Sequence, residues 1–154
     1  MDAEYAYNEL TTSPPANVAA MIEAMRQFVG ANEMMAYLVM MTQRIKELHR
    51  VLKSTGSLYL HCDPTASHYL KILLDTVFGK DRFLSEISWR RTGAHSDGKQ
   101  GRKNLGHIRD VILFYSKSNS YVWNTQFTPY GQSYIESSYR HVEPGTGRRF
   151  RLDI

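Results

Sequence analysis

The chain has 154 residues, of which 42% are hydrophobic and 22% charged, the ordinary balance of a globular domain long enough to bury a core. Its net charge of +4 permits an anionic partner but does not establish one. One cysteine excludes an internal disulfide framework, and the sequence contains neither an apolar run long enough to span a bilayer nor a signal-peptide pattern. We therefore expect a soluble, cytoplasmic protein with no membrane partner.

The first third of the chain predicts two helices behind an N-terminal arm. Residues Met1–Thr12 show no clear periodicity and are expected to form the arm rather than a core element. Ser13-Pro14-Pro15 begins a helix with apolar residues at helical spacing, and Gly30 ends it. A longer helix with a wide apolar stripe follows from the N-cap Asn32 to about Lys53.

The stretch Ser57–Cys62 is a short apolar run between turn signals, with a helical pattern on each side. This pattern predicts a buried strand of an α/β sheet. Polar groups just past the carboxyl end of such a strand stand where ligands bind, so His61, Cys62 and Asp63 are candidate site residues. The alternative interpretation is a strand that simply ends in a turn.

One more helix and two more strands are predicted after this stretch. The helix is expected to be capped by Thr65 and to end at Gly79-Lys80-Asp81. Phe83–Arg90 alternates in polarity and predicts a strand. Asp110–Lys117 is almost continuously apolar, which is typical of a central strand buried on both faces.

The C-terminal part predicts a small α+β extension. Tyr121–Phe127 is expected to be extended, Pro129–Tyr139 to hold a short helix, and His141–Leu152 to form a hairpin that turns at its two glycines. The fold class predicted for the whole chain is α/β.

A long segment, Arg91–Arg109, separates the last two strands and is rich in glycine and in basic residues. Such a segment suits contact with the phosphate backbone of a nucleic acid, because cations gain energy by neutralising phosphates. The alternative is a solvated loop. The candidate residues for phosphate contact are Arg91, Lys99, Arg102, Lys103 and Arg109. The histidines and Cys62 show no metal-ligand spacing, so no metal site is expected.

Several blocks of sequence, in one order, resemble the DNA amino-methyltransferases, the bacterial modification enzymes that methylate adenine N6 or cytosine N4. Arg44–Lys53 followed by Gly56–Asp63 carries the main resemblance. The blocks His68–Gly79, Phe83–Trp89 and His107–Lys117 follow in the family's order.

The resemblance implies a fold and a division into domains. Residues 1–127 would be part of a catalytic domain, with an arm and helix at 1–30, and residues 128–154 would begin the target-recognition region. The sheet would be a partial Rossmann-like methyltransferase sheet of about three strands. The strand of Phe114 would run antiparallel between the strand of His61 and the strand of Ile87.

The resemblance also implies an activity, which is methyl transfer from S-adenosylmethionine to an exocyclic amino group of adenine or cytosine in DNA. The residues that would form the wall of the base pocket are His61, Cys62, Asp63, Tyr115 and Ser116. The basic residues of Arg91–Arg109 would meet the DNA backbone. Cys62 is not expected to act as a nucleophile, because the methyl group passes directly to nitrogen.

Two motifs of the family are missing from the sequence. Ser13-Pro14-Pro15-Ala16 lacks the aromatic residue of the Pro-Pro-aromatic catalytic motif and follows no strand, and no glycine turn for the cofactor is present. We therefore assign no catalytic and no cofactor-binding residue. The chain is expected to be the middle of a methyltransferase, inactive and without bound cofactor when isolated. The alternative is a non-catalytic remnant that binds nucleic acid or dimerises.

The outer edge of Ser57–Cys62 would normally pair with the missing catalytic strand. Because an open apolar edge tends to find a partner, we expect a homodimer, a complementing methyltransferase chain, or cover by the N-terminal helix.

Overall fold

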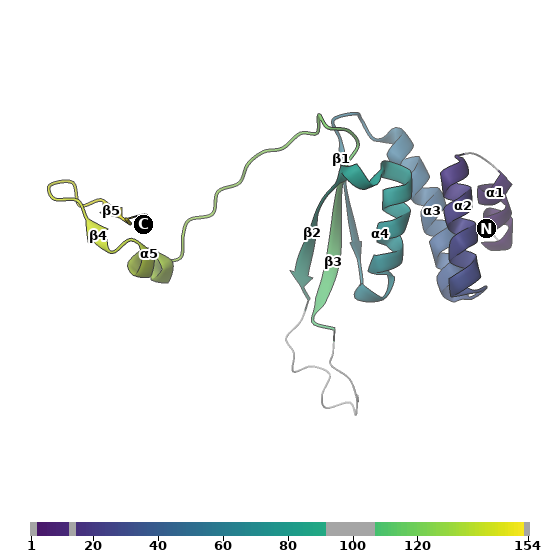
Figure 1. The fold of residues 1–154 in the computed structure, drawn as a ribbon, viewed down its shortest axis with the longest axis horizontal. Helices are drawn as coiled ribbons and strands as arrows, with labels where there is room; N and C mark the ends of the chain where they lie inside the picture. The colour runs from purple at the N-terminus through teal and green to yellow at the C-terminus, as the bar shows by residue number, and fades with distance from the viewer. Residues whose placement is uncertain (1–2, 13–14, 92–106, 153–154) are drawn as a thin grey trace, which may run out of the picture. The chain divides into compact units, whose positions relative to one another are not determined.

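The computed structural model of the protein describes residues 3–12, 15–91 and 107–152. The chain forms two compact units, Met1–Val122 and Trp123–Ile154 (Figure 1). In the first unit the elements are α1 (Ala3–Thr12), α2 (Ala16–Val29), α3 (Glu33–Val51), β1 (Ser57–Cys62), α4 (Pro64–Phe78), a 3-10 turn at Lys80–Arg82, β2 (Phe83–Arg90) and β3 (Arg109–Ser116). The second unit contains α5 (Gln132–Ser138), β4 (His141–Val142) and β5 (Arg149–Phe150).

The strands of the first unit form one small antiparallel sheet in the order β1-β3-β2, with β3 antiparallel to both neighbours. The register pairs Ser57 with Ser116 and Cys62 with Val111, so the start of β3 lies beside the end of β1. Nearly every residue of β3 is buried. The predicted strand order, the antiparallel central strand and its burial are all confirmed.

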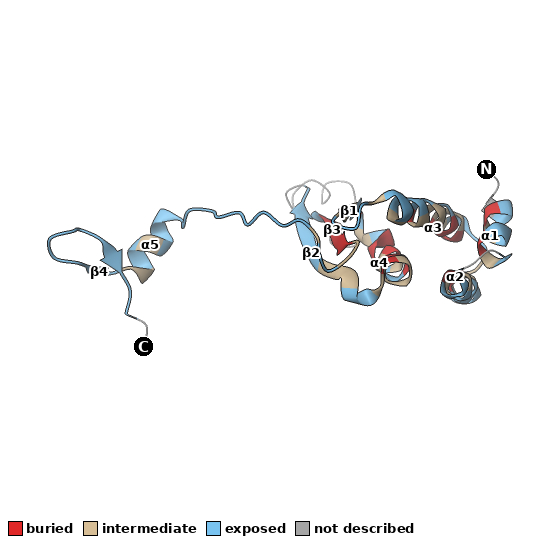
Figure 2. Ribbon diagram, turned by 90° about the horizontal axis from the view of Figure 1, so that it is seen from above, coloured by how far each residue is buried: buried red, intermediate tan, exposed pale blue. Residues whose placement is uncertain are grey.

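One face of the sheet belongs to the hydrophobic core. Helix α4 packs against β3, and α3, α2 and α1 lie beyond it on the same side of the sheet (Figures 1 and 2). Since side chains alternate along a strand, every second residue of β1 and β3 faces these helices. These core residues are Leu58, Leu60, Cys62, Val111, Leu113 and Tyr115.

The opposite face of the sheet carries large side chains that no helix of the first unit covers. Tyr59, Ile87 and Trp89 are exposed there. Phe114 is buried on this face because the ring of Tyr59 stacks on it at 4.2 Å between centroids and Tyr121 meets it edge-on. Within the described residues of the first unit, helices therefore cover only one side of the sheet.

The N-terminal residues differ from expectation, because Ala3–Thr12 forms helix α1 rather than an arm. Its buried residues are Ala6 and Leu10, which lie four positions apart and so share one helix face. Helix α1 packs on α2 and α3, and it has no extended contact with β1. Two buried apolar positions are too few for the sequence periodicity alone to distinguish a helix from an arm.

Helix caps explain where α3 and α4 begin. Asn32 caps α3 as predicted, its side chain accepting a hydrogen bond of 3.0 Å from the Met35 amide. The predicted cap of α4 at Thr65 is wrong. Asp63 fills that role, and its Oδ1 accepts a 3.0 Å hydrogen bond from the Ala66 amide. A carboxylate at this position also complements the positive end of the helix dipole.

The second unit is small and has no buried residue among the described positions 123–152. The short helix and the hairpin appear as predicted, with a turn between β4 and β5 in which Gly145 and Gly147 adopt positive φ angles of 91° and 71°. Tyr121–Phe127 forms no strand. In the described part of the chain, no helix has the length and apolar character needed to cross a membrane.

Candidate functional site

An open pocket of about 360 Å³ lies at the carboxyl end of β1. This volume is within the usual range of ligand pockets, which begins at about 300 Å³. Its lining comes from helix α3, the end of β1 and the first turn of α4. The lining residues are Met34, Tyr37, Cys62, Asp63, Thr65 and Ala66.

The lining combines apolar walls with groups that donate and accept hydrogen bonds. Burial raises the pKa of Tyr37, and nearby Cys62 and Asp63 raise that pKa further, so the phenol stays protonated and can donate. Burial, together with Asp63 and the carboxylates of Glu86 and Asp110, raises the pKa of Cys62 to about 11. The Cys62 thiol is therefore neutral near pH 7, and it donates a hydrogen bond to the Val111 carbonyl at 3.7 Å.

His61 lies on the other face of the sheet from this pocket, although it is adjacent to Cys62 in sequence. Its Nε2 is 3.0 Å from Oδ2 of Asp110, which is buried at the start of β3. Arg91, directly after β2, places its guanidinium 3.6 Å from Oδ1 of the same carboxylate. The ends of three strands thus bring one acid and two basic side chains together.

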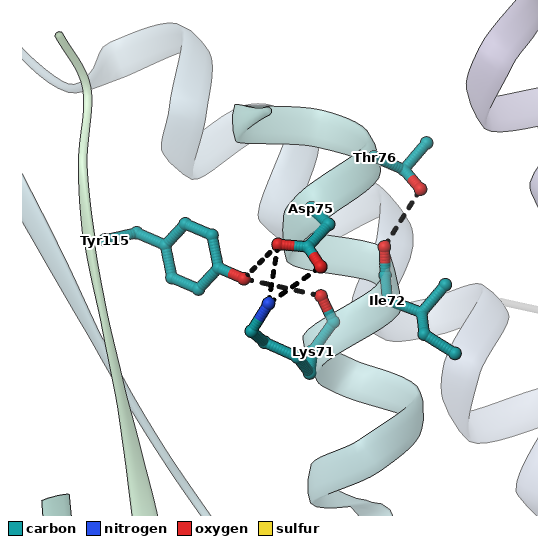
Figure 3. A network of polar contacts seen from close by, with 5 residues as sticks. All are labelled: Lys71, Ile72, Asp75, Thr76 and Tyr115. Carbon is teal, nitrogen blue, oxygen red and sulfur yellow. Dashed lines mark hydrogen bonds and ion pairs between the residues drawn. The ribbon is translucent and has the colours of Figure 1, made fainter. Parts of the chain in front are cut away.

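Tyr115 and Ser116 lie far from the pocket along the sheet. Ser116 pairs with Ser57 at the opposite end of β1. Tyr115 is fully buried and points toward α4, where its hydroxyl donates to Asp75 at 2.6 Å (Figure 3). Of the predicted wall residues, the structure therefore brings Cys62 and Asp63 to the pocket and places the other three elsewhere.

Two of the predicted DNA-binding residues lie at the same end of the sheet. The Arg91 amide donates to the Ile108 carbonyl at 3.0 Å, just beyond the paired ends of β2 and β3. Arg109 bonds Glu86 and Ser88 on β2, each at 3.1 Å, and its side chain remains half exposed. Lys99, Arg102 and Lys103 lie outside the described residues.

The described residues do not fit an S-adenosylmethionine cradle of the glycine-turn type. The turn from β1 into α4 carries Asp63-Pro64, whose side chain caps the helix. The described glycines with positive φ are Gly30, Gly79, Gly145 and Gly147, and they lie at helix ends or in the hairpin. None of the described residues therefore forms such a cradle. No cluster of three metal-ligating side chains occurs among the described residues.

Sequence reasoning missed three residues of this region. Met34 and Tyr37 occupy apolar helix positions that are indistinguishable from core positions in sequence. Asp110 did offer a signal, because it is a lone acid at the start of an otherwise apolar strand. A buried acid of this kind requires a partner, and His61 and Arg91 provide it.

Comparison with known proteins identifies the family and several relatives of this chain. A family model described as DNA methylase matches residues 8–146. The type II methyltransferase M.EcaI of Enterobacter cloacae is 35% identical over 89 residues, which cover 58% of this chain and 19% of that protein. The type II methyltransferase M.KpnI of Klebsiella pneumoniae is 33% identical over 88 residues, covering 57% of this chain and 20% of that protein.

A more distant relative is the Mod subunit of the type III restriction-modification enzyme StyLTI of Salmonella typhimurium. It is 25% identical over 116 residues, which cover 75% of this chain and 17% of that subunit. The chain thus spans about a fifth of the length of the relatives it matches. The match to the family model extends over most of the chain, and the protein belongs to the N6/N4 DNA methylase family.

Proposed function

We propose that this chain is part of an enzyme that transfers a methyl group from S-adenosylmethionine to an exocyclic amino group of adenine or cytosine in DNA. Family membership over residues 8–146 is the observation that carries the proposal. The two type II methyltransferases and the type III Mod subunit among its relatives support it.

In this proposal the pocket at the end of β1 receives the target base. Its apolar wall of Met34 and Tyr37 suits the faces of an aromatic ring, and Asp63 and Thr65 offer hydrogen-bonding groups to the ring edge. Cys62 contributes a neutral thiol, which fits a wall position rather than a nucleophile. Arg91 and Arg109 contact DNA phosphates, together with Lys99, Arg102 and Lys103.

The remaining parts of the catalytic domain belong to other segments or chains of the parent enzyme. The sheet of the first unit is then part of a Rossmann-like methyltransferase sheet, and residues 128–154 begin the target-recognition region. S-adenosylmethionine serves the parent enzyme and is bound by residues other than those described here. The isolated chain is expected to be inactive.

Titration calorimetry with S-adenosylmethionine and a gel-shift assay with duplex DNA test this assignment on one preparation. We expect no cofactor binding, and DNA binding that weakens steeply as salt rises.

Arg91→Gln and Arg109→Gln should each weaken DNA binding, whereas Arg50→Gln on α3, an exposed arginine, is the matched control. Cofactor binding would show that a cradle exists in the chain after all. Absence of DNA binding would contradict the role of the basic residues.

A second candidate function is a non-catalytic remnant that associates through its sheet. The outer edge of β1 has no partner strand among the described residues, and the adjoining face exposes Tyr59 and Trp89. Sedimentation analysis should then detect a dimer that Tyr59→Lys weakens, while Tyr5→Lys on the exposed side of α1 leaves it intact. A chain that stays monomeric at all concentrations excludes this candidate.

A further inference from the structure

The residues that follow β3 are fastened to the turn that joins α3 to β1. Three hydrogen bonds connect them: the Lys117 amide donates to the Gly56 carbonyl at 2.9 Å, the Ser118 hydroxyl to the Ser54 carbonyl at 2.7 Å, and the Val122 amide to the Thr55 carbonyl at 3.1 Å. The second unit begins directly after Val122. These bonds therefore fix the point at which the chain leaves the first unit.

The side chain of Lys117 ties the same segment to His49 in the last turn of α3. Its ammonium is 3.3 Å from Nδ1 of His49 and also donates to the His49 backbone carbonyl. An ammonium can only donate, so Nδ1 must be the acceptor, and the neutral imidazole carries its proton on Nε2. The ring is partly buried and meets Phe78 of α4 edge-on, with 4.6 Å between the centroids. The contact therefore requires a neutral histidine.

Among the described residues, no acid forms an ion pair with His49. The charged residues within four positions of it along the chain are Lys46, Glu47, Arg50 and Lys53. Glu47, the acid of this group, pairs with Arg50 at 2.7 Å. Helix α4 presents the uncharged ring of Phe78 to His49, and the segment after β3 presents the Lys117 ammonium. Burial lowers the pKa of His49, and the charge of Lys117 lowers it further.

We propose that His49 and Lys117 form an acid-sensitive latch, in which protonation of His49 opens their contact and loosens residues 117–122 from the turn. A protonated imidazole has no acceptor, so the ammonium loses its hydrogen bond and faces a second cation instead. The strands stay paired, because β1 and β3 are joined by their own ladder from Ser57 to Cys62. Opening of the latch lengthens the free chain that leads to the second unit. This inference concerns that tether and does not rest on the proposed function.

The direction of the pH dependence follows from the lowered pKa of His49. The folded chain keeps this histidine neutral to a lower pH than the ordinary value of 6.5, so the latch is fully closed above pH 6.5. As the pH falls below 6.5, the ratio of closed to open chains decreases. The decrease is at most about tenfold per pH unit, which is the limit for coupling to one proton.

Hydrogen exchange of the full chain, combined with a histidine titration by nuclear magnetic resonance, tests the latch. We expect the His49 ring to titrate below pH 6.5. The protection factors of the Lys117 and Val122 amides, which correct for the intrinsic pH dependence of exchange, should fall between pH 7.5 and pH 5. Those of amides in the middle of β3 should stay constant. Unchanged protection of Lys117 and Val122 while His49 gains its proton would overturn the proposal.

His49→Gln separates the proton from the other contacts of the side chain, because an amide oxygen can accept from Lys117 and does not titrate. The Lys117 and Val122 amides of this variant should keep the same protection at both pH values. His68→Gln, which changes an exposed histidine on α4, is the matched control and should keep the acid response.

Lys117→Met provides an independent test from the other side of the contact. It should bring the pKa of His49 closer to 6.5, because the neighbouring charge is gone, and it should weaken the acid response. An acid response that persists in His49→Gln, or a His49 pKa that is the same in Lys117→Met as in the parent chain, would show that these two residues do not form a latch.

Discussion

The hydroxyl of Tyr115 donates a 2.6 Å hydrogen bond to Oδ1 of Asp75, which ties the central strand β3 to helix α4 (Figure 3). Lys71 completes the network from one turn earlier on the helix, with its ammonium 2.8 and 2.7 Å from the two carboxylate oxygens. The same ammonium stands over the ring of Phe83 at 4.2 Å. These contacts together link β2, β3 and α4.

Tyr115→Phe should destabilise the protein by about 1–2 kcal/mol, because it removes a charge-assisted hydrogen bond from a buried position while preserving the ring. The Asp75 carboxylate keeps its bonds to Lys71, which limits the loss. Urea denaturation measures the effect. Tyr59→Phe on the exposed face should change stability very little, and a similar loss in both variants would argue against the network.

Leu10→Ala should destabilise the protein by about 2–4 kcal/mol, since it empties a fully buried position between α1 and its neighbours. Urea denaturation measures this loss. The control is Tyr5→Ala on the same helix, where the side chain is 68% exposed and a change within about 0.5 kcal/mol is expected. If Leu10→Ala is equally mild, then α1 does not belong to the core, and the arm expected from the sequence is the better description.

The strands could be predicted because their sequence patterns are strong and local. Ser57–Cys62 and Phe83–Arg90 have the predicted bounds, and β3 begins one residue earlier than expected and ends one residue earlier. In a chain of this length, a short continuous apolar run bounded by polar residues has few stable structures other than a buried strand. The resemblance to a family supplied the strand order, which local pattern alone cannot determine.

The arrangement of the candidate site could not be predicted to the same degree, because it depends on register and on the face of each side chain. His61 and Cys62 are neighbours in sequence and yet lie on opposite faces of the sheet. Since β3 is antiparallel, its first residues, and not Tyr115 and Ser116, reach the end of β1. Asp110 consequently meets His61, a contact that spans 49 positions in sequence.

Asp63 offers a way to separate the hydrogen bond that caps α4 from the charge of the carboxylate. Asp63→Ala should destabilise the protein by about 1 kcal/mol, since the Ala66 amide at the start of α4 loses its cap. Asp63→Asn keeps an oxygen for the cap and removes only the charge, so its stability should stay close to that of the parent. Thermal or urea unfolding compares the two. An equally large loss in Asp63→Asn would show that the charge, acting on the helix dipole, matters more than the hydrogen bond.

The raised pKa of Cys62 predicts both slow thiol chemistry and a pH-dependent stability. Burial and the nearby carboxylates move this pKa from 9.0 to about 11, so at pH 8 the folded chain should react with a disulfide reagent about tenfold more slowly, or slower still, than the urea-unfolded chain. The folded state keeps the thiol proton until about pH 11, whereas the unfolded chain releases it near pH 9. The contribution of this group is therefore complete below pH 9 and is lost as the pH rises toward 11.

Unfolding measured between pH 8 and pH 11 should show this loss in the parent chain and a shallower pH dependence in Cys62→Ala. The difference between the two chains isolates Cys62 from the buried tyrosines, because burial and the Asp75 carboxylate also raise the pKa of Tyr115 and the parent and the variant share that contribution. Parallel pH profiles, or a thiol that reacts equally fast in the folded and unfolded chains, would mean that Cys62 is open to solvent at the end of β1. The pocket beside it would then have a different lining from the one described.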